Sequence, residues 1–178
     1  MLTATGRQTG VTIIELLIAI ALLSLLVGIG VPTFRSWIQN SQIRTGADAV
    51  IGGIQLARAE AIRRNKPVEF VLRDGTNWEV VLVSPRTTLQ ERTGSDGSKN
   101  AVFEVEPAGA DRITFNPIGA PAANNQDGSL PIREIEISSS QDVSGLRKLN
   151  IVISVSGSVR MCDPDPNLLA DDPRRCTS

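Results

Sequence analysis

Residues 10–34 read GVTIIELLIAIALLSLLVGIGVPTF, and this stretch constrains the architecture of the whole chain. From Val11 to Phe34 the only charged residue is Glu15. At a rise of about 1.5 Å per residue, a helix of this length spans roughly 36 Å, which exceeds the roughly 30 Å hydrocarbon core of a bilayer. The stretch therefore predicts a helix that can cross a membrane.

The charges on either side of the apolar segment are unevenly distributed. Residues 33–66 hold six basic and two acidic residues, whereas residues 67–178 hold eleven basic and sixteen acidic residues. The chain of 178 residues nevertheless has a formal net charge of only -1. This order, a leader, an apolar segment, a basic stretch and a mildly acidic remainder, indicates a membrane-anchored protein rather than a cytosolic globule.

The composition excludes several classes of enzyme. The chain has no histidine and two cysteines, so it lacks the residues for a Ser-His-Asp triad, a Cys-His pair or an imidazole zinc site. The net charge also argues against a uniformly basic nucleic-acid binder. We therefore expect a protein that is not an enzyme, with no catalytic residues, no metal ligands and no cofactor.

Two ordinary interpretations of the apolar segment leave features unexplained. A removable secretory signal has an apolar core of about 7–15 residues followed by small residues at a cleavage site, and this run is longer and lacks an A-x-A pattern. A plain single-pass anchor gives no reason for Glu15, because an ionisable group inside lipid is costly and indicates a functional site.

The residues Gly10, Val11 and Glu15, followed by LLIAIALLSLL and Pro32, resemble the class III signal of type IV prepilins and pseudopilins. The resemblance implies that a prepilin peptidase cuts between Gly10 and Val11 and methylates the new N-terminus. It also implies that Glu15 pairs with the N-terminal amine of a neighbouring subunit during filament assembly. The family usually has phenylalanine at the position of Val11, so this chain departs from the pattern there.

Small and helix-breaking residues lie near the end of the apolar segment. Gly28, Gly30 and Pro32 weaken helical continuity, which predicts a site where the helix bends or locally unwinds. An alternative is that small residues are simply frequent in membrane helices. The residues alone leave both interpretations open.

Beyond the apolar segment the sequence predicts a second helical stretch and then strands. An apolar stripe marks an amphipathic helix over 35–66, which ends where Asn65 and Lys66 precede Pro67. The stripe, which we expect to belong to the core, comprises Ile43, Ala47, Val50, Ile54, Ala57 and Ala61. On the same helix Glu60 and Arg64 have the spacing of an ion pair. Strands are predicted at 67–73, 77–83, 101–106, 111–117, 131–137 and 148–155, with mobile loops near 85–100 and 118–130.

These segments predict an α+β protein in which one long N-terminal helix packs on an antiparallel sheet. Four parts follow: a leader at 1–10, a transmembrane or filament-core helix at 11–34, an amphipathic helix at 35–66 and a β head at 67–178. Asp74 and Gly75 mark the turn of the first hairpin.

Three runs narrow the resemblance to the GspH/FimT family of minor pseudopilins and pilins. They are LARAEAIRRNKPV at 56–68, ITFNPIGAP at 113–121 and SGSVRMC at 156–162. The family implies a minor subunit of a type II secretion pseudopilus or a type IV pilus, near the tip or initiating assembly. The implied partners are the prepilin peptidase, other minor subunits, the major subunit and an inner-membrane platform. The implied location is the bacterial inner membrane, crossed once, with the N-terminus cytoplasmic and the head periplasmic.

The C-terminal segment carries two further expectations. If the head is periplasmic, Cys162 and Cys176 lie in an oxidising compartment and should form a disulfide, with two free thiols as the alternative. The run at 157–160 resembles in part the GRxR motif with which some FimT-type pilins bind DNA. Arg160, Arg174 and Arg175 are therefore candidate phosphate contacts for a DNA-uptake pilin, although Ser158 replaces the first arginine and four aspartates lie nearby.

Overall fold

The computed structural model describes residues 10–74, 76–142 and 144–176. The chain divides into two compact units, Met1–Arg35 and Ser36–Ser178, and each is considered by itself. The first unit contains the apolar part of helix α1 (Ile13–Arg64), and the second contains the rest of α1 and all eight strands.

Helix α1 has a recognisable signal at each end. At its start the backbone N–H of Glu15 donates to Oγ1 of Thr12 over 3.3 Å, so Thr12 is the N-cap. At its end Asn65 adopts a left-handed backbone with φ of 51°, and Lys66 N donates to the Ala61 carbonyl, which closes the last turn before Pro67. The backbone is helical through Gly28, Gly30 and Pro32, so a bend or unwinding there stays a prediction.

Among the residues that the structure describes, the large side chains of the apolar part of α1 are exposed rather than buried in their own unit. An 18-residue window with a mean hydropathy of 2.7 is 0 % buried, and by length and composition the helix can cross a membrane. Its large side chains, from Ile13 to Phe34 where described, are exposed. The hydrophobic surface of this part is therefore left for a medium or a partner outside the chain.

In the part of the chain that the structure describes, eight strands form two antiparallel sheets rather than one. The first sheet has the order β3-β2-β1-β5, with β1 (Val68–Leu72), β2 (Trp78–Leu82), β3 (Thr87–Arg92) and β5 (Arg112–Phe115). The second has the order β4-β6-β7-β8, with β4 (Ala101–Glu106), β6 (Glu134–Ser139), β7 (Leu149–Ile153) and β8 (Val159–Cys162). Neighbouring strands are antiparallel throughout.

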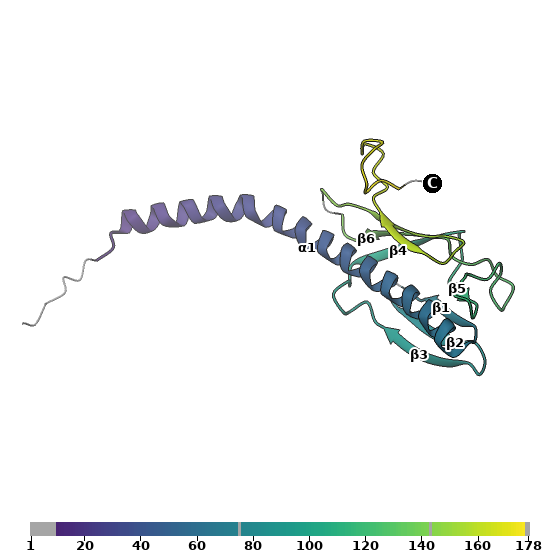
Figure 1. Ribbon diagram of the computed structural model, residues 1–178. Helices are drawn as coiled ribbons and strands as arrows, with labels where there is room; N and C mark the ends of the chain where they lie inside the picture. The colour runs from purple at the N-terminus through teal and green to yellow at the C-terminus, as the bar shows by residue number, and fades with distance from the viewer. Residues whose placement is uncertain (1–9, 75, 143, 177–178) are drawn as a thin grey trace, which may run out of the picture. The chain divides into compact units, whose positions relative to one another are not determined.

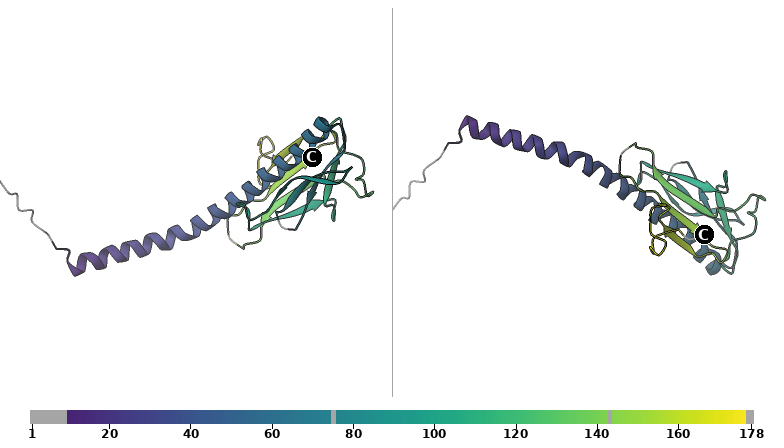
Figure 2. Two further views of the ribbon diagram at one scale, coloured as in Figure 1. Left: turned by 90° about the horizontal axis from the view of Figure 1, so that it is seen from below. Right: turned by 90° about the horizontal axis from the view of Figure 1, so that it is seen from above.

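The core of the second unit lies between α1 and the inner faces of the two sheets. All six residues of the predicted apolar stripe are at most 1 % exposed, which confirms the stripe as core. They pack with apolar side chains that alternate along the strands, among them Phe70, Ile113, Ile135 and Ile151. Figures 1 and 2 show this end of α1 running along the strands. At its exposed surface, Arg63 and Arg64 both contact Glu60 at 2.6 Å.

The structure differs from the sequence expectations in four places. Strand β3 lies inside the predicted loop at 85–100, and strand β8 lies beyond the last predicted strand. Strand β6 begins at Glu134 and not at Pro131, because residues 131–133 are not part of the strand. The predicted loop at 118–130 is tied down, since the buried Asn125 side chain accepts from the backbone N–H of Thr114 over 3.0 Å.

Two adjacent glycines give a sharp test of how closely α1 approaches the sheet. A Cβ on Gly53 would lie 2.6 Å from Phe70 Cε2, whereas a Cβ on Gly52 would have nothing within 4 Å. We expect Gly53→Ala to lower the free energy of unfolding by about 1–3 kcal/mol through overpacking. Gly52→Ala should raise it by up to about 1 kcal/mol through helix propensity. Denaturant unfolding of the detergent-solubilised chain measures both, and equal effects would contradict the close contact.

Candidate functional sites at the helix N-terminus and beside the disulfide

The predicted cleavage site precedes the helix. Gly10, Val11 and Thr12 are not helical, and the first helical residue is Ile13. The Thr12 cap separates the Gly10–Val11 peptide bond from the hydrogen-bonded helix, so an extended substrate conformation there disrupts no helical turn. The local backbone is therefore suited to a protease that cuts between Gly10 and Val11.

Glu15 occupies the third helical position after the Thr12 cap. The spacing Thr12-x-x-Glu15 is that of a capping box, a feature that was readable from the sequence and was missed. Among the described residues no ion pair involves the Glu15 carboxylate, and the side chain of the following Leu16 is exposed. Its position near the helix N-terminus also favours a negative charge. Glu15 therefore has the spacing of a capping-box residue, and its backbone N–H is satisfied by the Thr12 hydroxyl.

Residues of helix α1 and of three later segments of the chain enclose a cleft of about 420 Å³ in the second unit. We call it the arginine-rimmed cleft; its lining residues are Asn40, Ile43, Arg44, Arg147, Leu149, Met161, Cys162, Asp163, Pro173 and Arg174. Ile43, which is 1 % exposed, lies at its base with the half-buried Leu149 and Met161. An apolar floor thus lies beneath three guanidinium groups.

The side chain of Asn40 fixes one wall of the cleft. Its Nδ2 donates to the carbonyl of Gly145 over 3.1 Å, and its Oδ1 accepts from the backbone N–H of Arg147 over 2.9 Å. Both bonds join α1 to the segment between β6 and β7, about a hundred residues later in the chain. The backbone of Arg147 is therefore held against the helix while its side chain stays exposed.

The opposite wall is fixed by a disulfide between Cys162 and Cys176, fourteen residues apart. Beside it, Asp163 N donates to the Arg174 carbonyl over 2.7 Å and Cys176 N donates to the Asp163 carbonyl over 3.2 Å. These backbone bonds and the disulfide hold the start and the end of the loop together. The position of Arg174 therefore depends on the covalent bond.

The structure does not bring all three predicted DNA-contacting arginines to one place. Arg174 lines the cleft, but its guanidinium is paired with Asp172 at 2.7 Å. The side-chain hydrogen bond from Arg174 lowers the pKa of Asp172 to about 2. Arg175 donates to the Leu168 carbonyl, and Arg160 is exposed on β8 without lining the cleft. The other two arginines that line the cleft are Arg44 and Arg147, which the sequence analysis did not single out.

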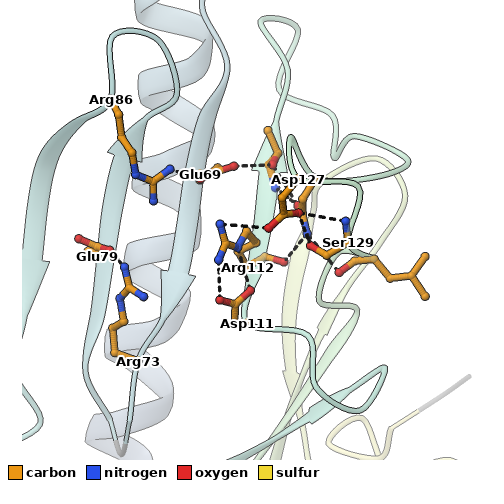
Figure 3. A network of polar contacts seen from close by, with 11 residues as sticks. Glu69, Arg73, Glu79, Arg86, Asp111, Arg112, Asp127 and Ser129 are labelled. Carbon is orange, nitrogen blue, oxygen red and sulfur yellow. Dashed lines mark hydrogen bonds and ion pairs between the residues drawn. The ribbon is translucent and has the colours of Figure 1, made fainter.

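A second polar cluster lies on the outer face of the first sheet (Figure 3). Glu69, 1 % exposed, accepts from Arg86 at 3.1 Å and from the Thr114 hydroxyl at 3.4 Å. Nearby, Arg112 contacts Asp127 at 3.3 Å, tying the segment before β6 to strand β5.

Two aspartates of this cluster, Asp111 and Asp127, have lowered pKa values. A side-chain hydrogen bond from Arg112 lowers the pKa of Asp111, and a hydrogen bond from the Ser129 hydroxyl lowers that of Asp127. Each partner lies on the segment that covers the sheet or on the strand beneath it. The cluster therefore holds the 116–130 segment against the first sheet.

Comparison with known proteins places these features in a family. Residues 5–31 match the prokaryotic N-terminal methylation motif, and residues 46–157 match the family described as type II transport protein GspH. No curated protein sequence matches the chain.

Two crystal structures of the type IV minor pilin FimU from Pseudomonas aeruginosa PAO1 are similar to the chain. One is 19 % identical and covers 67 % of this chain and 87 % of its own, with a TM-score of 0.48. The other is 16 % identical and covers 66 % and 90 %, with a TM-score of 0.47. The GspH match spans more than half of the sequence, and the chain therefore belongs to the GspH family.

Proposed function

We propose that the chain is a minor pilin or pseudopilin, a structural subunit that supports assembly of a type IV pilus or a type II secretion pseudopilus. The observation that carries the proposal is an N-terminal methylation motif joined to an apolar helix that its own unit leaves unburied. A helix of this kind is stable in a bilayer or among the helices of other subunits, and a filament subunit needs both states in turn.

Processing at Gly10 would convert the membrane precursor into an assembly-competent subunit. Cleavage between Gly10 and Val11 leaves 168 residues with a formal charge of -2, because Arg7 is the only charged side chain in the leader. The apolar helix stays attached, so the product remains anchored. A prepilin peptidase on the cytoplasmic face is the proposed enzyme, and Val11 is the proposed site of N-methylation.

Glu15 is the proposed assembly residue. A carboxylate within an apolar medium requires a compensating charge, and the new amine at Val11 of a neighbouring subunit supplies one. Because the structure describes no ion pair at Glu15 within the chain, the carboxylate is available for that contact. Pairing between subunits would draw the helix out of lipid into the filament.

The head would lie in the periplasm or on the filament, with the chain crossing the inner membrane once. Its proposed partners are other minor subunits, the major subunit and the inner-membrane assembly platform. DNA uptake remains a prediction that no observation here favours, because Arg174 is paired with Asp172 and Asp163 lines the same cleft.

The test is the mass of the mature protein together with its incorporation into filaments. Membrane-extracted protein should have the mass of residues 11–178 plus one methyl group, while Gly10→Val should retain the leader and be absent from sheared filaments. Leu2→Ala, which changes the leader away from the bond, is the matched control. Full-length wild-type protein in a strain with active peptidase would refute the proposal. Assaying a deletion strain for piliation and for protein secretion then identifies the machine.

A further inference from the structure

The arginine-rimmed cleft combines an apolar floor with three arginines, and these arginines differ in whether they form ion pairs within the chain. The guanidinium group of Arg174 forms an ion pair with Asp172 at 2.7 Å. Arg44 contacts Asp48 only at 3.8 Å, with both side chains at least 60 % exposed, so this pair contributes little. Among the described residues, Arg147 has no ion-pair partner. Two cationic groups are therefore available at the rim.

The walls of the cleft are fixed before any partner binds. Asn40 holds the backbone of Arg147, and the Cys162–Cys176 disulfide holds the segment of Arg174. A cleft built in advance binds with a smaller loss of conformational freedom than one that must be ordered. The arrangement favours a short side chain or turn entering between two preset walls.

We propose that the cleft receives a segment of a neighbouring filament subunit in which a carboxylate lies beside an apolar side chain. The carboxylate would bind Arg44 and Arg147, and the apolar side chain would cover Leu149 and Met161 on the floor. The inference rests on the proposed function, because the neighbour is taken to be a subunit of the same filament. Arg44 lies only ten residues beyond Phe34 in the chain, so this region follows directly on the segment proposed to pack among other subunits.

The same features disfavour DNA as the occupant. Among the described residues that line the cleft none is aromatic, so these residues offer bases no stacking surface. The apolar floor also offers no favourable contact to a charged phosphate backbone. A protein carboxylate beside an apolar side chain can bind the arginines of the rim while the apolar side chain packs on the floor.

The experiment uses the full chain in its own cells. A benzophenone amino acid replaces Pro173, an exposed rim residue, and irradiated adducts are mapped by mass spectrometry. We expect an adduct with another processed filament subunit, at a segment with Asp or Glu beside an apolar residue. Arg44→Glu with Arg147→Glu should reduce the adduct at least about tenfold, because the rim then repels the carboxylate.

A matched control makes the same change of charge elsewhere. Lys66→Glu with Lys99→Glu alters two exposed basic residues that do not line the cleft and should leave the adduct unchanged. Changing the mapped acidic residue of the partner to arginine should restore the adduct with the doubly reversed chain. Thermal unfolding of all variants checks that the fold is retained.

The outcomes separate the inference from the proposed function. An adduct that persists in the doubly reversed chain, or one that is sensitive to nuclease, overturns the inference while filament incorporation still stands. Adducts with a filament subunit that lack an acidic residue at the mapped site overturn it as well. If the wild-type chain never enters filaments, the proposed function fails first.

Discussion

Replacing Glu15 by leucine is expected to abolish incorporation into filaments while leaving membrane insertion intact. The helix becomes more apolar, so partitioning into the bilayer is not weakened. The substitution removes the attraction to the N-terminal amine of a neighbouring subunit. Without that attraction, moving the helix from lipid to neighbouring helices replaces one apolar environment by another and gains little free energy. We expect filament-associated protein to fall at least about tenfold relative to wild type, a change of roughly 1.4 kcal/mol or more.

Glu15→Gln distinguishes this role from the capping box. Glutamine at the third helical position caps as well as glutamate but carries no charge. If the charge matters, Glu15→Gln is excluded from filaments like Glu15→Leu. If only the Thr12 cap matters, it assembles like wild type. Quantitative immunoblots of membrane and sheared-filament fractions give the answer, and normal incorporation of Glu15→Leu would remove the assembly role altogether.

Breaking the disulfide is expected to lower the free energy of unfolding of the head by up to about 3 kcal/mol. The bond closes a loop with a sequence separation of fourteen residues, and in the chain-entropy model a loop of about fifteen residues contributes about that amount. Cys162→Ser and Cys176→Ser should have similar effects, because each removes the same bond. The effect of Cys162→Ser should be slightly larger, because Cys162 is the more buried of the two.

Denaturant unfolding of the detergent-solubilised chain measures the loss, with the double serine variant as the control for a lone thiol. Non-reducing peptide mapping of protein from cells should find the two cysteine peptides linked. Two alkylatable thiols in the isolated protein would contradict both the bond and the proposed periplasmic location.

The helical part of the fold could be predicted because its signals are local. The six stripe residues repeat at spacings of three and four, and Pro67 ends the pattern, so the buried face and its boundary follow from the sequence. The first hairpin was likewise marked by Asp74 between two apolar runs. In each case a few neighbouring residues determine the structure.

Edge strands and long-range sites lack such signals. Strand β3 reads TTLQER and is mostly exposed, so it has no apolar alternation and is defined by its pairing with β2. Strand β8 has only four residues and pairs with β7 at the sheet edge. The cleft joins Arg44 to Arg147 through contacts across about a hundred residues, which no local pattern encodes.

The apolar part of α1 is exposed on every side for which the structure describes side chains. Lipid tails are about as apolar as leucine, so exchanging a lipid annulus for neighbouring helices changes hydrophobic burial very little. The helix is therefore nearly neutral between the bilayer and the filament. Under the proposed function, the direction of transfer would then depend on the Glu15 carboxylate and on contacts of the head. If the chain is a filament subunit as proposed, a disassembled subunit would be able to return to the membrane and be used again.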